Sequence, residues 1–372
     1  MKEQIENRMG QQKKIIIAGG GTGGHIFPAI AIANALKKMD PATEFLFVGA
    51  KGKMEMEKVP QAGYKIEGID IAGLNRSSLI KNISLPWKLI KSFFQVRRIV
   101  NDFRPDAVIG VGGYSSFPVL RFAQQKGIPT FIHESNSFAG KANIMLGKKA
   151  TRIMVAAEKM DKFFPKEKIV VTGNPVRSVI TESHASREEA LSFFGLKVNQ
   201  PVVLVVGGSL GAKSINEAIE TGVATIQEEG IQLIWQTGQL FGERATQAAQ
   251  GKEGIKVMPF IREMEMAYAA ADVVVSRAGA MAIAELCVVG KPVIFVPYPF
   301  AAEDHQTANA KELEAASAAE MVKDETVKTT LVPTLLELVK NETKRKQFID
   351  NIKKKGVKDA DKKIAEIISQ NS

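Results

Sequence analysis

A glycine run that ends in a histidine, at residues 19–25, is well suited to bind a phosphate or a sugar. Glycines let a ligand approach backbone amides, and amides at a helix start bind anions. His25 follows the last glycine, and its side chain has an intrinsic pKa near ~6.5, so it could act as a general base. The spacing leaves a second interpretation open, in which His25 caps the start of the following helix.

A second glycine loop lies half a chain later, at residues 207–212. Its backbone amides and the hydroxyl of Ser209 could bind a phosphate. The alternative is a tight strand-to-helix turn in which Ser209 is the N-cap.

Two polar side chains follow later strands and could bind sugar hydroxyls. Glu285 lies about a turn and a half into a helix that begins among small residues, where a carboxylate can accept hydrogen bonds from both hydroxyls of a ribose. The alternative for Glu285 is an ordinary surface glutamate. Gln306 lies in a polar helix start after a strand that ends in prolines, and its amide could bridge two sugar hydroxyls.

The glycines at 19, 21 and 24 also match a dinucleotide-binding fingerprint. Such sites need an acidic residue at the end of the second strand to bind the ribose. Here that strand ends at Lys51 without an acid, which counts against a nicotinamide-dependent oxidoreductase.

These segments must be positioned by strands and helices, which alternate through both halves of the chain as in an α/β fold. A buried strand, a glycine turn and a helix occur in that order twice, beginning at residues 14 and 202. Further strands are predicted at residues 45–48, 107–111, 129–132, 152–155, 231–235, 255–258, 272–275 and 292–296. We therefore expect two doubly wound, Rossmann-like domains that divide near residues 172–175 and face an interdomain cleft.

Composition narrows the class of protein. The 372 residues carry a net charge of +10, which suggests anionic partners. The single cysteine, Cys287, lies in an apolar helical pattern and is predicted to be a buried structural thiol. No stretch approaches the ~18 to 20 apolar residues that span a bilayer, so we expect a protein that stays inside the cell. The Asp-Ala-Asp triplet at 359–361 lies in a Lys-rich tail and is predicted to be surface, not a metal site.

Between Ile71 and Asn101 the chain has no acidic residue and mixes basic with apolar side chains. That combination favours an anionic membrane surface. The residues assigned to this membrane patch are Leu79, Ile80, Ile83 and Trp87. Four others at helical spacing are predicted to be core: Leu89, Phe93, Val96 and Val100.

Seven segments in order resemble the MurG family, glycosyltransferase family 28. They are Gly-Gly-Thr-Gly-Gly-His at 20–25, Gly-Gly-Tyr at 112–114, His-Glu-Ser-Asn at 133–136, Gly-Asn-Pro-Val-Arg at 173–177, the loop at 207–212, the segment 279–285, and Asp-His-Gln-Thr-Ala-Asn-Ala at 304–310. The resemblance covers nearly the whole chain from Lys13. It implies the GT-B architecture, with an N-terminal acceptor- and membrane-facing domain at 12–174, a UDP-sugar domain at 175–349, and a C-terminal helix at about 350–372 that packs back on the first domain.

The resemblance also implies residue roles. In the first half, His25 would be the base or a ligand of the acceptor diphosphate, and Asn136 would hydrogen-bond N-acetylglucosamine. Thr22, Gly23 and Gly24 would touch the donor sugar nucleotide.

In the second half, Ser209 would contact the nucleotide phosphates together with Arg177. Ile261 would present its backbone to uracil, Glu285 would bind ribose, and Gln306 would bind the sugar. Helix-start backbone contacts are expected from Ala280, Met281, Ala282, Ile283 and Ala284.

The implied reaction is inverting transfer of N-acetylglucosamine from UDP-N-acetylglucosamine to a polyprenyl-diphosphate acceptor, lipid I, without a metal or other cofactor. The implied location is the cytoplasmic face of the plasma membrane, with other cell-wall synthesis proteins as partners and no nucleic acid. Two alternatives remain from the residues alone: a UDP-sugar 2-epimerase or glycolipid synthase, and a non-enzymatic nucleotide-sensing or nucleic-acid-binding protein.

Overall fold

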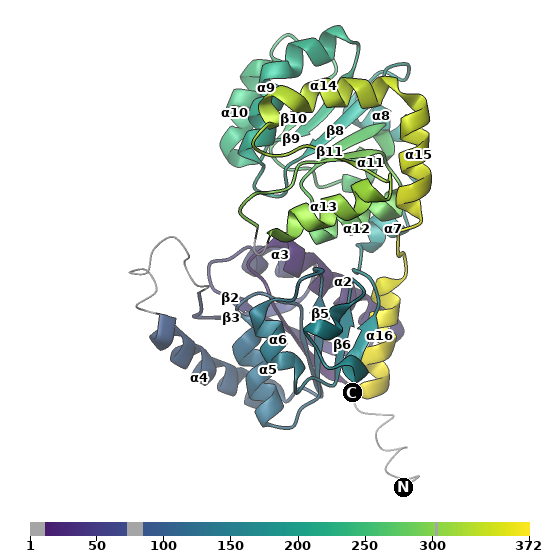
Figure 1. Cartoon of the computed structure of the whole chain (residues 1–372). Helices are drawn as coiled ribbons and strands as arrows, with labels where there is room; N and C mark the ends of the chain where they lie inside the picture. Colours follow the sequence, from purple (N-terminus) through teal and green to yellow (C-terminus); the bar gives the residue numbers. More distant parts are fainter. Residues whose placement is uncertain (1–11, 73–84, 302–303) are drawn as a thin grey trace. The chain divides into compact units, whose positions relative to one another are not determined.

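The computed structural model describes residues 12–72, 85–301 and 304–372, and it divides into two compact α/β units (Figure 1). Unit 1 comprises residues 1–177 and 359–372, and unit 2 comprises residues 178–358. The chain thus leaves unit 1 after Arg177 and returns to it at Asp359.

Unit 1 is built on a parallel sheet of seven strands in the order β3-β2-β1-β4-β5-β6-β7. Its strands are β1 (Lys14–Ala18), β2 (Glu44–Ala50), β3 (Lys65–Ile69), β4 (Ala107–Gly110), β5 (Thr130–Glu134), β6 (Arg152–Val155) and β7 (Ile169–Val171). Its α-helices are α2 (Gly23–Met39), α3 (Glu55–Gln61), α4 (Leu85–Phe103), α5 (Ser116–Gln125), α6 (Lys141–Gly147) and α16 (Ala360–Asn371).

Alternate side chains of β1 explain why this strand is apolar throughout. Ile15 and Ile17 pack in one cluster with residues of α2 and α16, whereas Ile16 and Ala18 pack in another with residues of α4 and α5. Successive side chains of a strand point to opposite faces, so a sheet covered by helices on both faces needs a continuous apolar run.

Unit 2 repeats the plan with six parallel strands in the order β10-β9-β8-β11-β12-β13. The strands are β8 (Val202–Val206), β9 (Gln232–Gln236), β10 (Ile255–Met258), β11 (Val273–Ser276), β12 (Val293–Phe295) and β13 (Glu320–Met321). The α-helices are α7 (Ser178–Thr181), α8 (Arg187–Phe194), α9 (Lys213–Glu228), α10 (Gly242–Ala249), α11 (Met264–Ala270), α12 (Ala280–Val289), α13 (His305–Ala315), α14 (Val327–Lys340) and α15 (Glu342–Lys353).

The predicted α/β class is confirmed, and each predicted strand is present within two residues of its expected ends. Three strands were not predicted: β3, β7 and β13. They lie at or near sheet edges, and none has more than five residues. A short edge strand buries few side chains and leaves a weak apolar signal.

The C-terminal helix α16 lies alongside α2 in unit 1, as Figure 1 shows. Ile364, Ala365 and Ile368 are buried there, and Lys362 and Lys363 on the opposite face are exposed. Asp359 pairs with Lys363 at the start of this helix. The basic tail is therefore an amphipathic helix whose apolar face completes the core of unit 1.

Candidate functional site

In unit 1, the glycine run connects β1 to α2 in a turn that has no room for a side chain at Gly19 or Gly20. A Cβ atom on Gly20 would lie 2.3 Å from the carboxyl group of Glu55, and Gly21 has a φ of +90°. Thr22 is the N-cap of α2 in an extended conformation, without a side-chain capping bond, and Gly23 is the first helical residue. The first amides of a helix have no partner within it, so this turn presents N–H donors.

His25 lies in the first turn of α2 and points back to the loop. Its Nδ1 atom is 3.1 Å from the carbonyl oxygen of Gly20 and 3.4 Å from the hydroxyl of Thr22. Because a carbonyl oxygen only accepts, the shorter contact requires a proton on Nδ1. The neutral ring then carries its lone pair on Nε2, which is the atom that a general base would use.

Burial lowers the pKa of His25, and the nearby charge of Glu134 partly opposes this shift, as do the hydrogen bond to Gly20 and the charge of Glu55. The imidazole is therefore neutral at physiological pH. That is the form required of a base. The interpretation of His25 as a cap of the helix start is wrong, because the N-cap is Thr22 and the Nδ1–H of His25 donates to the Gly20 carbonyl oxygen.

Another glycine-containing loop of unit 1, between β4 and α5, packs against the turn between β1 and α2. A Cβ atom on Gly113 would lie 2.5 Å from the Gly20 oxygen, and one on Gly112 would lie 2.9 Å from Nε2 of His25. Both glycines have positive φ values, +95° at Gly112 and +83° at Gly113. A side chain at Gly112 would therefore collide with the Nε2 edge of His25.

The loop after β5 is organised by a buried carboxylate that sequence reasoning did not assign. One oxygen of Glu134 accepts hydrogen bonds from the backbone and side-chain amides of Asn136, at 3.1 and 3.2 Å. The other accepts from the Gly140 backbone and from Asn143. Asn136 is thus oriented through its side-chain nitrogen, and its predicted contact with N-acetylglucosamine stays a prediction.

Arg177, predicted to lie in the second domain, is the last residue of unit 1 before the chain enters unit 2. Its guanidinium lies over the ring of Phe27 in α2, 5.1 Å from the centroid. This arrangement holds the cation beside the helix that carries His25. Contact with a phosphate stays a prediction.

In unit 2, the loop after β8 leads into α9, whose N-cap is Ala212. The interpretation of Ser209 as the N-cap is therefore wrong, because the turn continues for three more residues. Gly211 has a φ of +77°, and its Cβ would lie 2.0 Å from the Thr237 oxygen. Close approach of the next strand forces this turn, and Ser209 lies half-buried within it.

Glu285 is only 8% exposed, so the alternative interpretation of this residue as an ordinary surface glutamate is wrong. Oε2 of Glu285 accepts a hydrogen bond of 3.2 Å from the hydroxyl of Tyr268 on α11. The residue lies in the second turn of α12, which begins at Ala280 after the N-cap Gly279. The first helical turn is made by Ala280, Met281, Ala282 and Ile283, followed by Ala284, and all five are half-buried.

Gln236 is a buried residue of this unit that sequence reasoning missed. Its side-chain amide donates to the Gly208 oxygen and accepts from the Ile261 N–H, both at 2.9 Å. It thus ties the loop after β8 and the loop after β10 to the end of β9. The Ile261 N–H is engaged by this bond, and the predicted backbone contact of Ile261 with uracil stays a prediction. Gln306 is also oriented, since its Oε1 accepts from the Tyr298 N–H at 3.0 Å.

The predicted membrane patch is described only in part. Leu79, Ile80 and Ile83 lie outside the described residues, and Trp87 on α4 is 76% exposed. Ile90 and Phe94, which follow Trp87 at helical spacing, are 50% and 68% exposed. In the described parts of the chain, no helix is long and apolar enough to cross a membrane.

Of the residues predicted to be core in this helix, Val96 and Val100 are buried and Phe93 is half-buried. The prediction is wrong for Leu89, which is 37% exposed. Residues 87–91 of α4 are all exposed, and burial against the core begins at Ser92.

Asp70, just after β3, fastens α4 to the sheet. Hydrogen bonds from Lys51, Lys91 and Gln95 lower the pKa of this carboxyl to about 2. Gln95 also accepts from the Asp70 N–H at 2.8 Å, so helix and strand end are joined in both directions.

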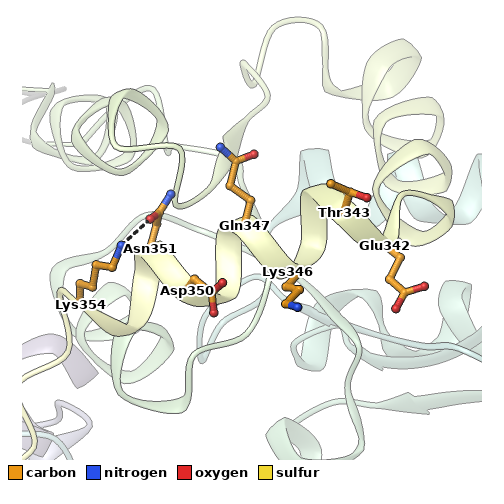
Figure 2. Close-up of a pocket in the computed structure, with 7 residues that line it drawn as sticks. All are labelled: Glu342, Thr343, Lys346, Gln347, Asp350, Asn351 and Lys354. Carbon is orange, nitrogen blue, oxygen red and sulfur yellow. Dashed lines mark hydrogen bonds between the residues drawn. The ribbon is translucent and has the colours of Figure 1, made fainter.

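Two further features of unit 2 are Cys287 and a hollow on α15. Cys287 is buried, and burial raises its pKa to about 12, in agreement with the predicted structural thiol. Figure 2 shows a hollow along α15 that is lined by polar side chains of that helix alone, with none of the predicted site residues.

Two family models match the chain in order: the glycosyltransferase family 28 N-terminal domain over residues 15–155 and the C-terminal domain over residues 202–364. A relative from Phocaeicola vulgatus, named UDP-N-acetylglucosamine–N-acetylmuramyl-(pentapeptide) pyrophosphoryl-undecaprenol N-acetylglucosamine transferase, is 49% identical over 360 residues, or 96% of each chain. The crystal structure of Acinetobacter baumannii MurG aligns with a TM-score of 0.74 at 29% identity, covering 96% of this chain and 99% of that one.

A solved UDP-N-acetylglucosamine 2-epimerase also aligns, with a TM-score of 0.65 at 14% identity over 96% of this chain and 95% of that one. At that identity the likeness concerns the fold alone. The fold and the glycine-loop sites define a glycosyltransferase of the GT-B class. The chain belongs to glycosyltransferase family 28.

The burial of His133 in unit 1 predicts that the stability of this unit depends on pH. Burial lowers the pKa of His133 to about 4, although the hydrogen bond to Gly173 and the charge of Glu134 act to raise it. Below pH ~6.5 the unfolded chain binds a proton that the folded unit does not, so stability is lost as pH falls toward 4. We expect a loss of roughly 3 kcal/mol in the free energy of unfolding, which hydrogen exchange of the β5 amides would report.

The variant His133→Gln should lack most of this pH dependence. His184→Gln, which replaces an exposed histidine, should retain it and serves as the control. Equal slopes in the wild type and His133→Gln would contradict the assignment.

Proposed function

We propose that this glycosyltransferase moves N-acetylglucosamine from UDP-N-acetylglucosamine to the C4 hydroxyl of the muramyl residue of undecaprenyl-diphosphate-muramyl-pentapeptide. The acceptor is lipid I and the product is lipid II of peptidoglycan synthesis. The observation that carries the proposal is near full-length identity of 49% to a relative named for this transfer. The neutral, oriented His25 and the buried Glu285 supply the chemistry that it needs.

Unit 2 would hold the donor. Glu285 can accept from ribose hydroxyls because burial beside Tyr268 fixes its carboxylate. The first turn of α12 offers N–H donors and the positive end of a helix dipole. The Ser209 hydroxyl would add a further donor to the diphosphate, the Ile261 carbonyl would accept from uracil, and Gln306 would bind the sugar.

Unit 1 would hold the acceptor and the base. The muramyl oxygen forms a bond to C1 of N-acetylglucosamine while the bond from C1 to the UDP oxygen breaks, and the electron pair leaves with UDP. The hydroxyl proton passes to Nε2 of His25, and attack from the face opposite UDP inverts the anomeric centre. Help from such a base is typically worth ~10² to 10⁴-fold in rate.

In this proposal, unit 1 also orients both substrates. Asn136 would hydrogen-bond the transferred sugar, while Thr22, Gly23 and Gly24 would contact the donor at the start of α2. The glycines of the β4–α5 loop would receive the acceptor diphosphate. Arg177 would then stabilise negative charge on a phosphate, which an oriented guanidinium does well.

The lipid tail of the acceptor lies in a membrane, so the enzyme must contact the membrane surface. Helix α4 has side chains suited to that contact. Trp87, Ile90 and Phe94 are exposed among the basic side chains Lys88 and Lys91. Apolar side chains enter the interface, and each nearby basic charge contributes on the order of 1 kcal/mol at an anionic surface. We therefore place the enzyme peripherally on the cytoplasmic face of the plasma membrane, near other cell-wall synthesis proteins.

The direct test is transfer of radiolabelled N-acetylglucosamine from its UDP sugar to purified lipid I in detergent micelles. We expect labelled lipid II with the β configuration. Release of a free 2-epimer without labelled lipid would favour the epimerase instead, and the absence of either product would reject both.

Donor recognition can be tested separately by calorimetric titration with UDP. The variant Glu285→Gln should bind UDP about tenfold more weakly, because a hydrogen bond to a charged group is worth ~1.5 to 3 kcal/mol. The control is Glu312→Gln, an exposed glutamate of α13. Unchanged affinity in Glu285→Gln would refute the ribose contact.

Membrane association can be tested by flotation with vesicles of phosphatidylglycerol and phosphatidylethanolamine. Replacing Trp87, Ile90 and Phe94 together with serine should reduce the bound fraction at least tenfold, since about 0.8 kcal/mol is lost per CH₂ withdrawn from the interface. The control is Val171→Ser, an exposed apolar residue of β7. Equal flotation of the triple variant and the control would remove α4 from the membrane contact.

A further inference from the structure

The peptide group that joins Gly20 to Gly21 is held at both of its polar atoms. Its N–H, which belongs to Gly21, donates to Oε2 of Glu55 at 2.9 Å. Its carbonyl oxygen, which belongs to Gly20, lies 3.1 Å from Nδ1 of His25. Because a peptide group is planar and rigid, the carboxylate and the imidazole bind opposite ends of one fixed dipole.

Glu55 itself is firmly placed. It begins α3 and is 1% exposed, and its second oxygen accepts the Ala50 N–H at the end of β2, also at 2.9 Å. A Cβ atom added to Gly49 would lie 2.4 Å from Cγ of Glu55, and one added to Gly20 would lie 2.3 Å from the Glu55 carboxyl group. Both glycines are thus needed for this carboxylate to reach the loop.

We propose that Glu55 is a positioning residue for the transfer reaction, which acts through the Gly20–Gly21 peptide to keep the proton of His25 on Nδ1 and its lone pair on Nε2. The inference rests on the proposed function, in which Nε2 of His25 takes the acceptor proton. A base oriented by a third group is a general device of nucleophile activation, and here one peptide group stands between base and carboxylate.

The electrostatic reason is polarisation along the chain of hydrogen bonds. A negative charge on the N–H side of an amide increases the negative charge on its oxygen, which strengthens each bond by perhaps ~10 to 30%. The stronger acceptor favours the Nδ1–H tautomer. A hydrogen bond to the Nδ1 proton also stabilises the imidazolium that forms when Nε2 takes a proton.

Several groups face His25, and their effects can be separated. Burial lowers the pKa of His25, whereas the charges of Glu134 and Glu55 and the hydrogen bond to Gly20 raise it. His133 lies close enough for mutual repulsion when charged. Tyr114, next to Gly21, is uncharged at neutral pH, since the ordinary pKa of a tyrosine is ~10 and burial raises it further. Removing the charge of Glu55 alone should therefore lower the pKa of His25 further.

The experiment is nitrogen-15 NMR of the full chain with labelled histidine, where long-range proton correlations show which ring nitrogen carries the proton. The chain has four histidines, so His25→Asn identifies the signal. We expect the wild-type ring to be protonated at Nδ1 at pH 8. Protonation at Nε2 would overturn the proposal without any variant of Glu55.

The variant Glu55→Gln keeps the size of the side chain and removes its charge. We expect its His25 to titrate at lower pH, the acid limb of the kcat/KM profile to move in the same direction, and kcat to fall about 10-fold. Glu55→Asp keeps the charge but is one methylene shorter, so its His25 should titrate closer to the wild type. If Glu55 only packs the loop, Glu55→Gln leaves the tautomer and titration of His25 unchanged, which would overturn the proposal.

The matched control is Glu57→Gln on the same helix, since the Glu57 side chain is 65% exposed and pairs with Lys58 at the surface. It should alter neither the titration of His25 nor the rate. The NMR readout needs no substrate. If His25 carries its proton on Nδ1 but the enzyme does not glycosylate lipid I, the proposed function is rejected. If the enzyme is active but His25 carries its proton on Nε2, the role of Glu55 is rejected.

Discussion

Both units depend on one steric constraint: a buried parallel strand must connect to a helix through a tight turn in which particular positions have no room for a side chain. In unit 1 this turn is confined by Glu55 and by the β4–α5 loop, and in unit 2 the loop after β8 is confined by the backbone at Thr237. Because the turn is so tight, the helix starts close to the sheet and directs its unpaired N–H groups outward from the strand ends. The proposed phosphate contacts depend on this packing.

Burial then determines the chemistry of the groups around those turns. His25 is kept neutral by desolvation, yet it is surrounded by the carboxylates of Glu55 and Glu134, each of which is fully engaged by hydrogen bonds to the loops. The carboxylates thus fix the backbone and at the same time provide negative charge that favours an imidazolium as it forms. In unit 2, Gln236 and Tyr268 orient a loop and a carboxylate in the same indirect way. The residues predicted to contact ligand are thus held in place by hydrogen bonds with neighbouring residues.

Residues 87–91 of α4 are the exception to this pattern of burial, since all five are exposed. From Ser92 onward the helix packs on the sheet, and Gln95 joins it to Asp70 after β3, whereas Trp87, Ile90 and Phe94 remain exposed. The proposed contact with a membrane surface depends on these exposed apolar side chains.

The sequence by itself determined the α/β class, the two glycine turns and the strands around them, because buried parallel strands and tight turns restrict residue type locally. It also singled out His25, Glu285 and Gln306. Only the tertiary structure decided that Ser209 is not an N-cap, that Leu89 is partly exposed, and that Glu55, Glu134 and Gln236 support the site. A glutamate in a polar helix looks the same in sequence whether it faces water or accepts two buried N–H groups, because burial and hydrogen-bond partners come from segments distant along the chain.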